Sequence, residues 1–74
     1  MDDVKFEIVE NFGILSTSPS GWTKELNLIS WNGGEPKYDV RQWAPDHSKM
    51  GKGVSLSREE AEELKQLLTK WLPR

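Results

Sequence analysis

Aromatic rings and cations alternate along the middle of this 74-residue chain. Three of its four tryptophans lie between residues 22 and 43, among lysines and one arginine, and two more lysines follow in the glycine-punctuated segment 49–53. Flat rings stack on unpaired nucleic-acid bases, and neighbouring cations hold the phosphates. This pattern predicts a surface that binds single-stranded nucleic acid. The candidate residues are Trp22, Lys24, Trp31, Lys37, Arg41, Trp43, Lys49 and Lys52.

The segment 37–43 carries the densest part of this pattern. In a strand, alternation places Lys37, Asp39, Arg41 and Trp43 on one face. That face is too polar for a core, so we expect it to lie in solvent. Its charged side chains and the Trp43 ring would form a row about 20 Å long. The plainer alternative is a solvated face on which Asp39 only pairs with Lys37 or Arg41.

The four tryptophans differ as candidates for stacking. Trp43 is the best of them, because it shares a face with the charged side chains. Trp22 and Trp31 have opposite parities in one strand, so they cannot both be exposed unless a bulge intervenes. Trp71 falls on an apolar helical stripe, and we expect it to pack, with a dimer interface as one place for this packing.

Charge supports a nucleic-acid ligand only locally. The net charge is −2, which argues mildly against such a ligand. Residues 22–53 hold five basic and four acidic side chains, a net of +1. Gly51 and Gly53 would let the backbone approach a phosphate beside Lys49 and Lys52. The interpretation therefore depends on geometry as well as on charge.

Catalytic chemistry finds little support in the sequence. The chain has no cysteine, and its one histidine, His47, sits in a turn where we expect it to be solvated. The sequence offers no recognisable set of a nucleophile, a general base and a group that orients the base. We also expect no metal site, because zinc sites draw mainly on cysteine and histidine. The sequence predicts a protein that is not an enzyme and uses no cofactor.

Strand patterns precede a single helix, in the order ββββα. Antiparallel strands joined by hairpins are expected at residues 4–16, 22–31, 37–43 and 53–56. The first strand alternates, which places four apolar side chains on one face, with a bend or bulge at Gly13. These side chains are Phe6, Ile8, Phe12 and Ile14.

Two local signals are strong. Asn32-Gly33 predicts a hairpin turn, since both residues tolerate positive φ. Ser57 and Glu60 predict a capping box at the start of the C-terminal helix. Pro73 ends this helix. The helix carries an apolar stripe made of Leu64, Leu67, Leu68, Trp71 and Leu72.

A chain of 74 residues is long enough for one domain only, which we assign to residues 1–74. A chain this short buries only about 60% of its unfolded surface, and it has no disulfide to compensate. We therefore expect a homodimer that completes its core across the interface. No signal peptide, membrane anchor or small-molecule substrate is indicated, and we expect the protein in the cytoplasm.

Two motifs resemble a known family. They are the strand Asp39-Val-Arg41-Gln-Trp43 and the run Lys52-Gly53-Val-Ser55-Leu that leads into the helix. In their order and spacing they resemble the C-terminal domain of the transcriptional coactivator positive cofactor four, and closely its small bacterial branch, the YdbC-like proteins. The resemblance covers nearly the whole chain.

The resemblance implies a curved four-stranded antiparallel sheet with a C-terminal helix, an α+β fold that forms a symmetric dimer. It also implies grooves that bind single-stranded DNA, mostly without sequence preference. By position, the family's strand arginine falls on Arg41, the aromatic after it on Trp43, and the loop lysine on Lys52, with Lys49 nearby. The resemblance does not assign the other four candidates. Their place in the binding surface is inferred from side-chain chemistry alone, and they are Trp22, Lys24, Trp31 and Lys37. Single-stranded RNA binding by the same surface, or a protein-interaction module, are the alternatives.

Overall fold

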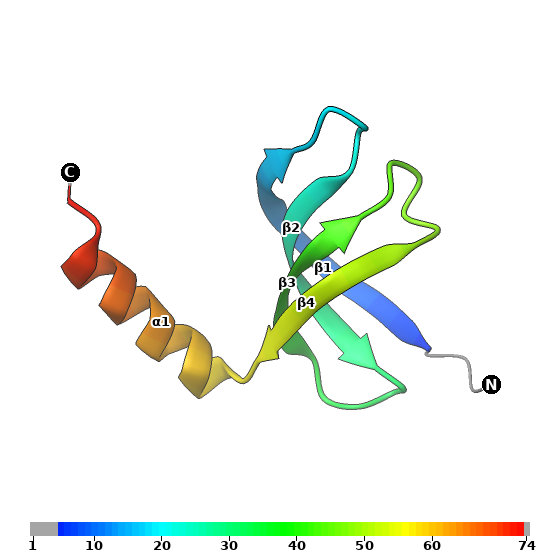
Figure 1. The fold of residues 1–74 in the computed structure, drawn as a ribbon. Coiled ribbons are helices and arrows are strands. Elements are labelled where there is room, and N and C mark those ends of the chain that lie inside the picture. The colour runs from blue at the N-terminus through cyan, green and yellow to red at the C-terminus, as the bar shows by residue number, and fades with distance from the viewer. Residues whose placement is uncertain (1–4, 74) are drawn as a thin grey trace.

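Four antiparallel strands and one helix make up the computed structural model, which describes residues 5–73 (Figure 1). The strands lie in chain order within one sheet, as predicted. The fourth strand begins three residues earlier than expected, and the Val4 of the predicted first strand lies outside the described residues. The elements are β1 (Phe6–Thr17), β2 (Thr23–Trp31), β3 (Lys37–Trp43), β4 (Met50–Leu56) and α1 (Arg58–Trp71).

The turn between β2 and β3 confirms the hairpin signal. Asn32 and Gly33 have φ of 53° and 76°, the left-handed conformations that asparagine and glycine tolerate best. The Gly34 N–H donates to the carbonyl of Trp31 at 2.8 Å, which closes the turn. The register that follows sets β2 and β3 directly opposite each other from Thr23 to Ile29.

Strand β1 is bulged at three places, which changes its faces along its length. The expectation that Phe12 shares a face with Phe6 is wrong. Phe6 packs against Trp43, with ring centroids 5.3 Å apart, whereas Phe12 stacks on Tyr38 on the other side of the sheet at 5.8 Å. Each bulge inserts an extra residue, which turns the following side chains over and adds twist.

The two faces of the sheet have inverted polarity. Directly opposite residues share a face, so the register assigns odd-numbered residues of β2 and β3 to one face and even-numbered residues to the other. The first, here called the buried face, holds residues that are at most 2% exposed: Glu25, Asn27, Ile29, Asp39 and Trp43. The second, here called the helix-side face, lies toward α1 and presents Leu26, Leu28, Tyr38, Val40 and Leu56.

The expectation that the polar face of β3 lies in solvent is therefore wrong. The sheet curls, so that the beginning of β1 reaches across β2 (Figure 1). The Phe6 ring in this segment contacts the rings of both Trp31 and Trp43. The covered polar groups bond to one another instead of to water, as buried polar groups must. One such pair is Asn27 and Glu25, in which Asn27 Nδ2 donates to Glu25 Oε1 at 3.3 Å.

Helix α1 begins with the predicted capping box. The Glu60 N–H donates to Ser57 Oγ at 3.1 Å, and the Ser57 N–H donates to Glu60 Oε1 at 2.9 Å. The helix then projects away from the sheet, and none of its residues, all within the described part of the chain, is buried (Figure 1). Its predicted apolar stripe is exposed in the single chain, up to 71% at Trp71, so Trp71 does not pack within the chain. Its packing at a dimer interface stays a prediction. Within residues 5–73 no helix is long and apolar enough to cross a membrane.

Substitution of Trp43 tests the burial of the polar face of β3. We expect Trp43→Ala to lower the free energy of unfolding by about 3–5 kcal/mol, because it empties a filled site in the core. Trp43→Phe should cost less, since it keeps a ring and since Trp43 Nε1 finds no hydrogen-bond partner among the described residues. Urea denaturation followed by circular dichroism measures both. An alanine variant as stable as the wild type would show that the Trp43 ring is not buried in the core.

Candidate nucleic-acid interface

Arg41 is held by the protein on nearly all sides. Its Nε and Nη2 donate to the two carboxylate oxygens of Asp39, at 2.7 and 2.9 Å, in a bidentate ion pair. Its Nη1 donates to the carbonyl of Gly51 at 3.3 Å and approaches the sulfur of Met50 at 3.6 Å. A guanidinium has five N–H donors, so few remain for a phosphate. Only 15% of the Arg41 side chain is exposed, which makes it chiefly a link between β3 and β4.

Trp31 lies beside this ion pair at the end of β2. The Arg41 guanidinium sits over its ring, 4.8 Å from the centroid, and the Phe6 ring is tilted against it at 5.9 Å. Its Nε1 donates to Ser55 Oγ at 3.1 Å. The ring is half-buried, and cation–π contact of this kind holds an indole in place. Trp31 is therefore a partly exposed ring with a fixed orientation.

Trp43 cannot present its ring to a base in this structure. It is 0% exposed, between the Phe6 ring and the His47 ring, the latter stacked on it at 5.4 Å. The expectation that Trp43 lies on a solvated face, as the best of the stacking candidates, is thus wrong about its exposure. Alternation identified the face correctly, but it could not show that the curl of the sheet covers that face.

A buried carboxylate lies beside Trp43. The Glu25 carboxylate accepts from Thr23 Oγ1 and lies 2.9 Å from His47 Nε2. Burial raises the pKa of Glu25, but hydrogen bonds from Thr23, His47 and Asn27 outweigh it, so that the pKa lies below its ordinary value. As expected, His47 lies exposed in the β3–β4 loop, with 44% of its side chain in solvent. Its ring also ties this loop to Glu25 on β2, a contact that the sequence did not indicate.

The candidate lysines are exposed but do not all share one face. Lys37 is on β3 on the same face as Asp39, Lys49 lies in the β3–β4 loop and Lys52 on β4. Lys24 pairs with Gln42 on the helix-side face, away from Arg41. Within residues 5–73 no ion pair involves any of these four lysines. Their charge is available to a ligand.

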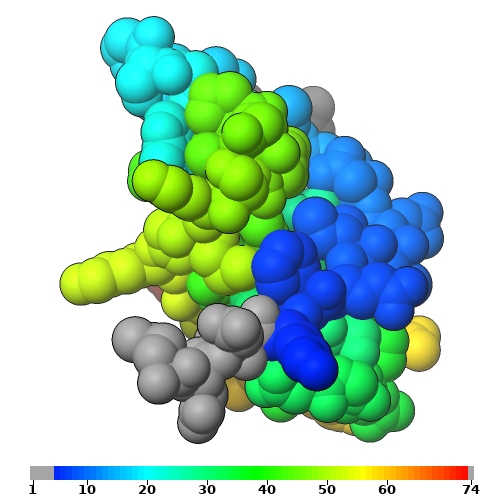
Figure 2. Space-filling model, turned by 90° about the vertical axis from the view of Figure 1, so that its right-hand side faces the viewer, coloured from blue at the N-terminus to red at the C-terminus, as the bar shows by residue number. Residues whose placement is uncertain are grey.

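The surface over the buried face is built by three segments. Figure 2 shows the β3–β4 loop and β4, in yellow-green, beside the dark blue beginning of β1, with the β2–β3 turn in green below. Gly53 permits the close approach of β4, because a Cβ there would collide with the Arg41 Cβ and the Val40 carbonyl. This glycine therefore serves strand packing, where the sequence suggested room for a phosphate. Gly51 would admit a Cβ at ordinary contact distance, 3.5 Å from Gln42.

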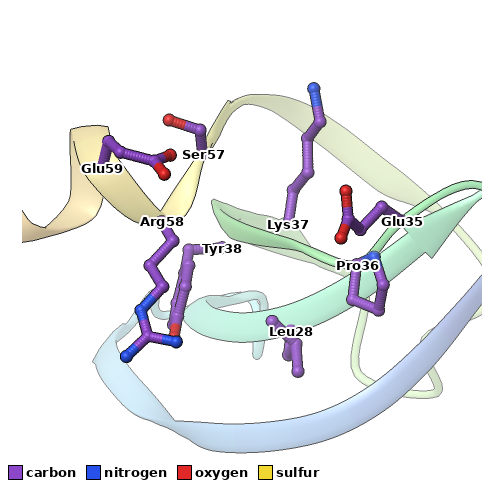
Figure 3. A pocket seen from close by; sticks show the side chains of 8 residues that line it. All are labelled: Leu28, Glu35, Pro36, Lys37, Tyr38, Ser57, Arg58 and Glu59. Atoms are coloured by element: carbon purple, nitrogen blue, oxygen red, sulfur yellow. The ribbon is translucent and has the colours of Figure 1, made fainter.

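An open pocket of about 380 Å³ lies elsewhere, between the β2–β3 connection and the start of α1 (Figure 3). Arg58 runs alongside the Tyr38 ring, while Lys37 points away from Leu28 and Pro36 (Figure 3). Its basic side chains are matched by two acidic ones, Glu35 and Glu59. This balance of charge gives the pocket no preference for a phosphate.

Sequence reasoning missed Ser55, Glu25 and His47 as parts of this region. Ser55 lies directly opposite Asp39 in the β3–β4 register and donates to Asp39 Oδ2 at 2.7 Å. The signal was present, because a hairpin between 37–43 and the following strand brings a serine and an aspartate together. The predicted fourth strand was too short to fix that register. Asp39 pairs with Arg41, one of the two partners left open by the sequence.

The lowered pKa of Glu25 makes a prediction for acid stability. A carboxyl whose folded pKa lies below its unfolded value of 4.5 stabilises the fold above that value and loses this contribution as pH falls through the folded pKa. The wild type should therefore lose more stability than Glu25→Gln between about pH 5 and about pH 3. Urea denaturation at each pH measures the difference. Equal losses in the two proteins would contradict the assignment.

Comparison with known proteins identifies the family. The profile named Transcriptional Coactivator p15 (PC4) matches residues 18–67, more than half of the chain. The chain is also similar to an uncharacterized protein of Treponema pallidum (strain Nichols), with 57% identity over 67 residues, which cover 90% of this chain and 79% of that protein. The matched range spans β2, β3, β4 and most of α1. The resemblance seen in the sequence is thereby confirmed, and the chain belongs to the Transcriptional Coactivator p15 (PC4) family.

Proposed function

We propose that this protein binds single-stranded DNA as a homodimer, largely without sequence preference and without a catalytic step. Membership of the PC4 family supports nucleic-acid binding in general. The observation that carries the proposal further is Trp31, a half-buried ring backed by the Arg41 guanidinium. A ring held in this way offers a base a stacking surface, and stacking tolerates any sequence because every base has a π face.

The proposed stacking rings are Trp31 and Trp22, which lie at opposite ends of β2. Trp22 is half-buried just before β2, in a loop closed by the hydrogen bond from the Ser18 N–H to the Trp22 carbonyl at 2.7 Å. Trp43 is left out of the proposed surface because of its burial. Each stacked base should contribute about 1–3 kcal/mol to binding.

The phosphates would be held by lysines rather than by Arg41. Three lysines are exposed and take part in no ion pair among the described residues: Lys37, Lys49 and Lys52. Arg41, in contrast, already donates most of its N–H groups to Asp39 and to β4. Phosphate contacts by lysines release counterions, so affinity falls with salt. Three contacts in a protomer correspond to a slope of about −2 in log affinity against log salt, at about −0.7 for each phosphate.

The proposed dimer would cover the apolar surface that α1 leaves open. A groove of about 380 Å³ lies between α1 and the helix-side face, lined by Leu26, Val40, Leu56, Leu64 and Leu68 among others. Large apolar side chains on α1 are 41–71% exposed, which is unusual for a stable lone domain. A second copy would bury this surface. A concentration-independent monomer in sedimentation equilibrium would contradict the dimer.

Removal of two lysines tests the proposed phosphate contacts. We expect the Lys49→Ala and Lys52→Ala double variant to bind oligo-dT more weakly at low salt, with a salt slope smaller by about 1.4. Lys24→Ala is the matched control, because it removes the same charge from the helix-side face. Fluorescence titrations at several salt concentrations measure the slopes.

The double variant with a wild-type slope would show that these lysines contact no phosphate. A wild-type affinity that does not change with salt would contradict nucleic-acid binding by this surface. Competition with an RNA oligomer of the same sequence measures the preference for deoxyribose. Tighter binding of the RNA would show that the preferred ligand is RNA and not DNA.

A further inference from the structure

A chain of hydrogen bonds fixes the edge of the Trp31 ring. Trp31 Nε1 donates to Ser55 Oγ at 3.1 Å, and Ser55 Oγ donates to Asp39 Oδ2 at 2.7 Å. An indole N–H can only donate and a carboxylate can only accept. The group between them must do both, which a hydroxyl does with a single atom. The direction of the chain is therefore determined, and it requires the Ser55 hydroxyl.

The far end of this chain is rigid. Asp39 is 0% exposed and takes two further hydrogen bonds from Arg41, at 2.7 and 2.9 Å. The same guanidinium lies 4.8 Å from the centre of the Trp31 ring. The indole is thus held at its edge by Ser55 on β4 and on one face by Arg41 on β3. Three strands together set the orientation of one half-buried ring.

We propose that Ser55 is a positioning residue for base stacking, which holds the Trp31 indole in the orientation that receives a base. This inference rests on the proposed function and adds to it a residue that touches no nucleic acid. A ring already fixed loses little side-chain freedom when a base stacks on it. Without the hydroxyl, the indole must be ordered when the base binds, and the affinity falls accordingly.

We expect the fold to remain intact when the Ser55 hydroxyl is removed. Asp39 keeps its bidentate pair with Arg41, so no buried charge becomes unpaired. The Trp31 N–H can turn to water, because its ring is half-buried. Threonine at position 55 keeps the hydroxyl and suits a strand. Ser55→Ala and Ser55→Thr therefore form a matched pair that differs in the hydroxyl.

The binding experiment titrates oligo-dT with the wild type, Ser55→Ala and Ser55→Thr at two salt concentrations. Ser55→Ala should bind about two- to tenfold more weakly, with the salt slope of the wild type, and Ser55→Thr should restore the affinity. In a Trp31→Phe background, Ser55→Ala should have no further effect, because phenylalanine has no N–H. An equal affinity of Ser55→Ala and the wild type, a failure of threonine to restore binding, or a full effect in the Trp31→Phe background would overturn the inference.

A second measurement needs no DNA. The Trp31 indole N–H resonance, identified by its loss in Trp31→Phe, should exchange with water faster in Ser55→Ala than in the wild type. The other three indole resonances should not change. Unchanged exchange at Trp31 would overturn the inference even if the protein binds DNA. A wild type that binds no oligo-dT would instead reject the proposed function, so that the two failures are distinguishable.

Discussion

The buried ion pair of Asp39 with Arg41 is the constraint on which the rest of the region depends. A fully buried carboxylate is costly unless it is paired and hydrogen-bonded, and Asp39 satisfies both conditions with Arg41 and Ser55. Through Arg41, the pair reaches the Gly51 carbonyl and the face of Trp31. Close packing of β4 against this arginine is possible because residue 53 is glycine. One charge pair thus sets the relation of three strands.

The distribution of polarity follows from this arrangement. The curled sheet encloses carboxylates and amides that bond to one another beside Ile29 and Trp43, while other apolar residues face the groove beside α1. An interior of this kind gives limited hydrophobic stabilisation to a domain of 74 residues. The proposed second copy would supply the missing burial on the helix-side face. The opposite side would then remain open for a nucleic acid, bordered by exposed lysines.

Local signals in the sequence predicted the elements well, because they depend on few residues. Asn32-Gly33 and the box of Ser57 and Glu60 have the conformations that their side chains favour. Alternation along β3 also predicted which residues share a face. It could not predict which face is covered, because the curl comes from bulges in β1 and from Phe6, which is distant in sequence. The reassignment of Trp43 from the surface to the core has this cause, and so has the change in the role of Arg41.

The most direct test follows single tryptophans during a titration with oligo-dT. Two variants each retain one ring, Trp31 or Trp43, and carry phenylalanine at the other three tryptophan positions. The account predicts strong quenching of the Trp31 fluorescence and little change at Trp43, which is 0% exposed between Phe6 and His47. Quenching of Trp43 with an unchanged Trp31 signal would contradict it.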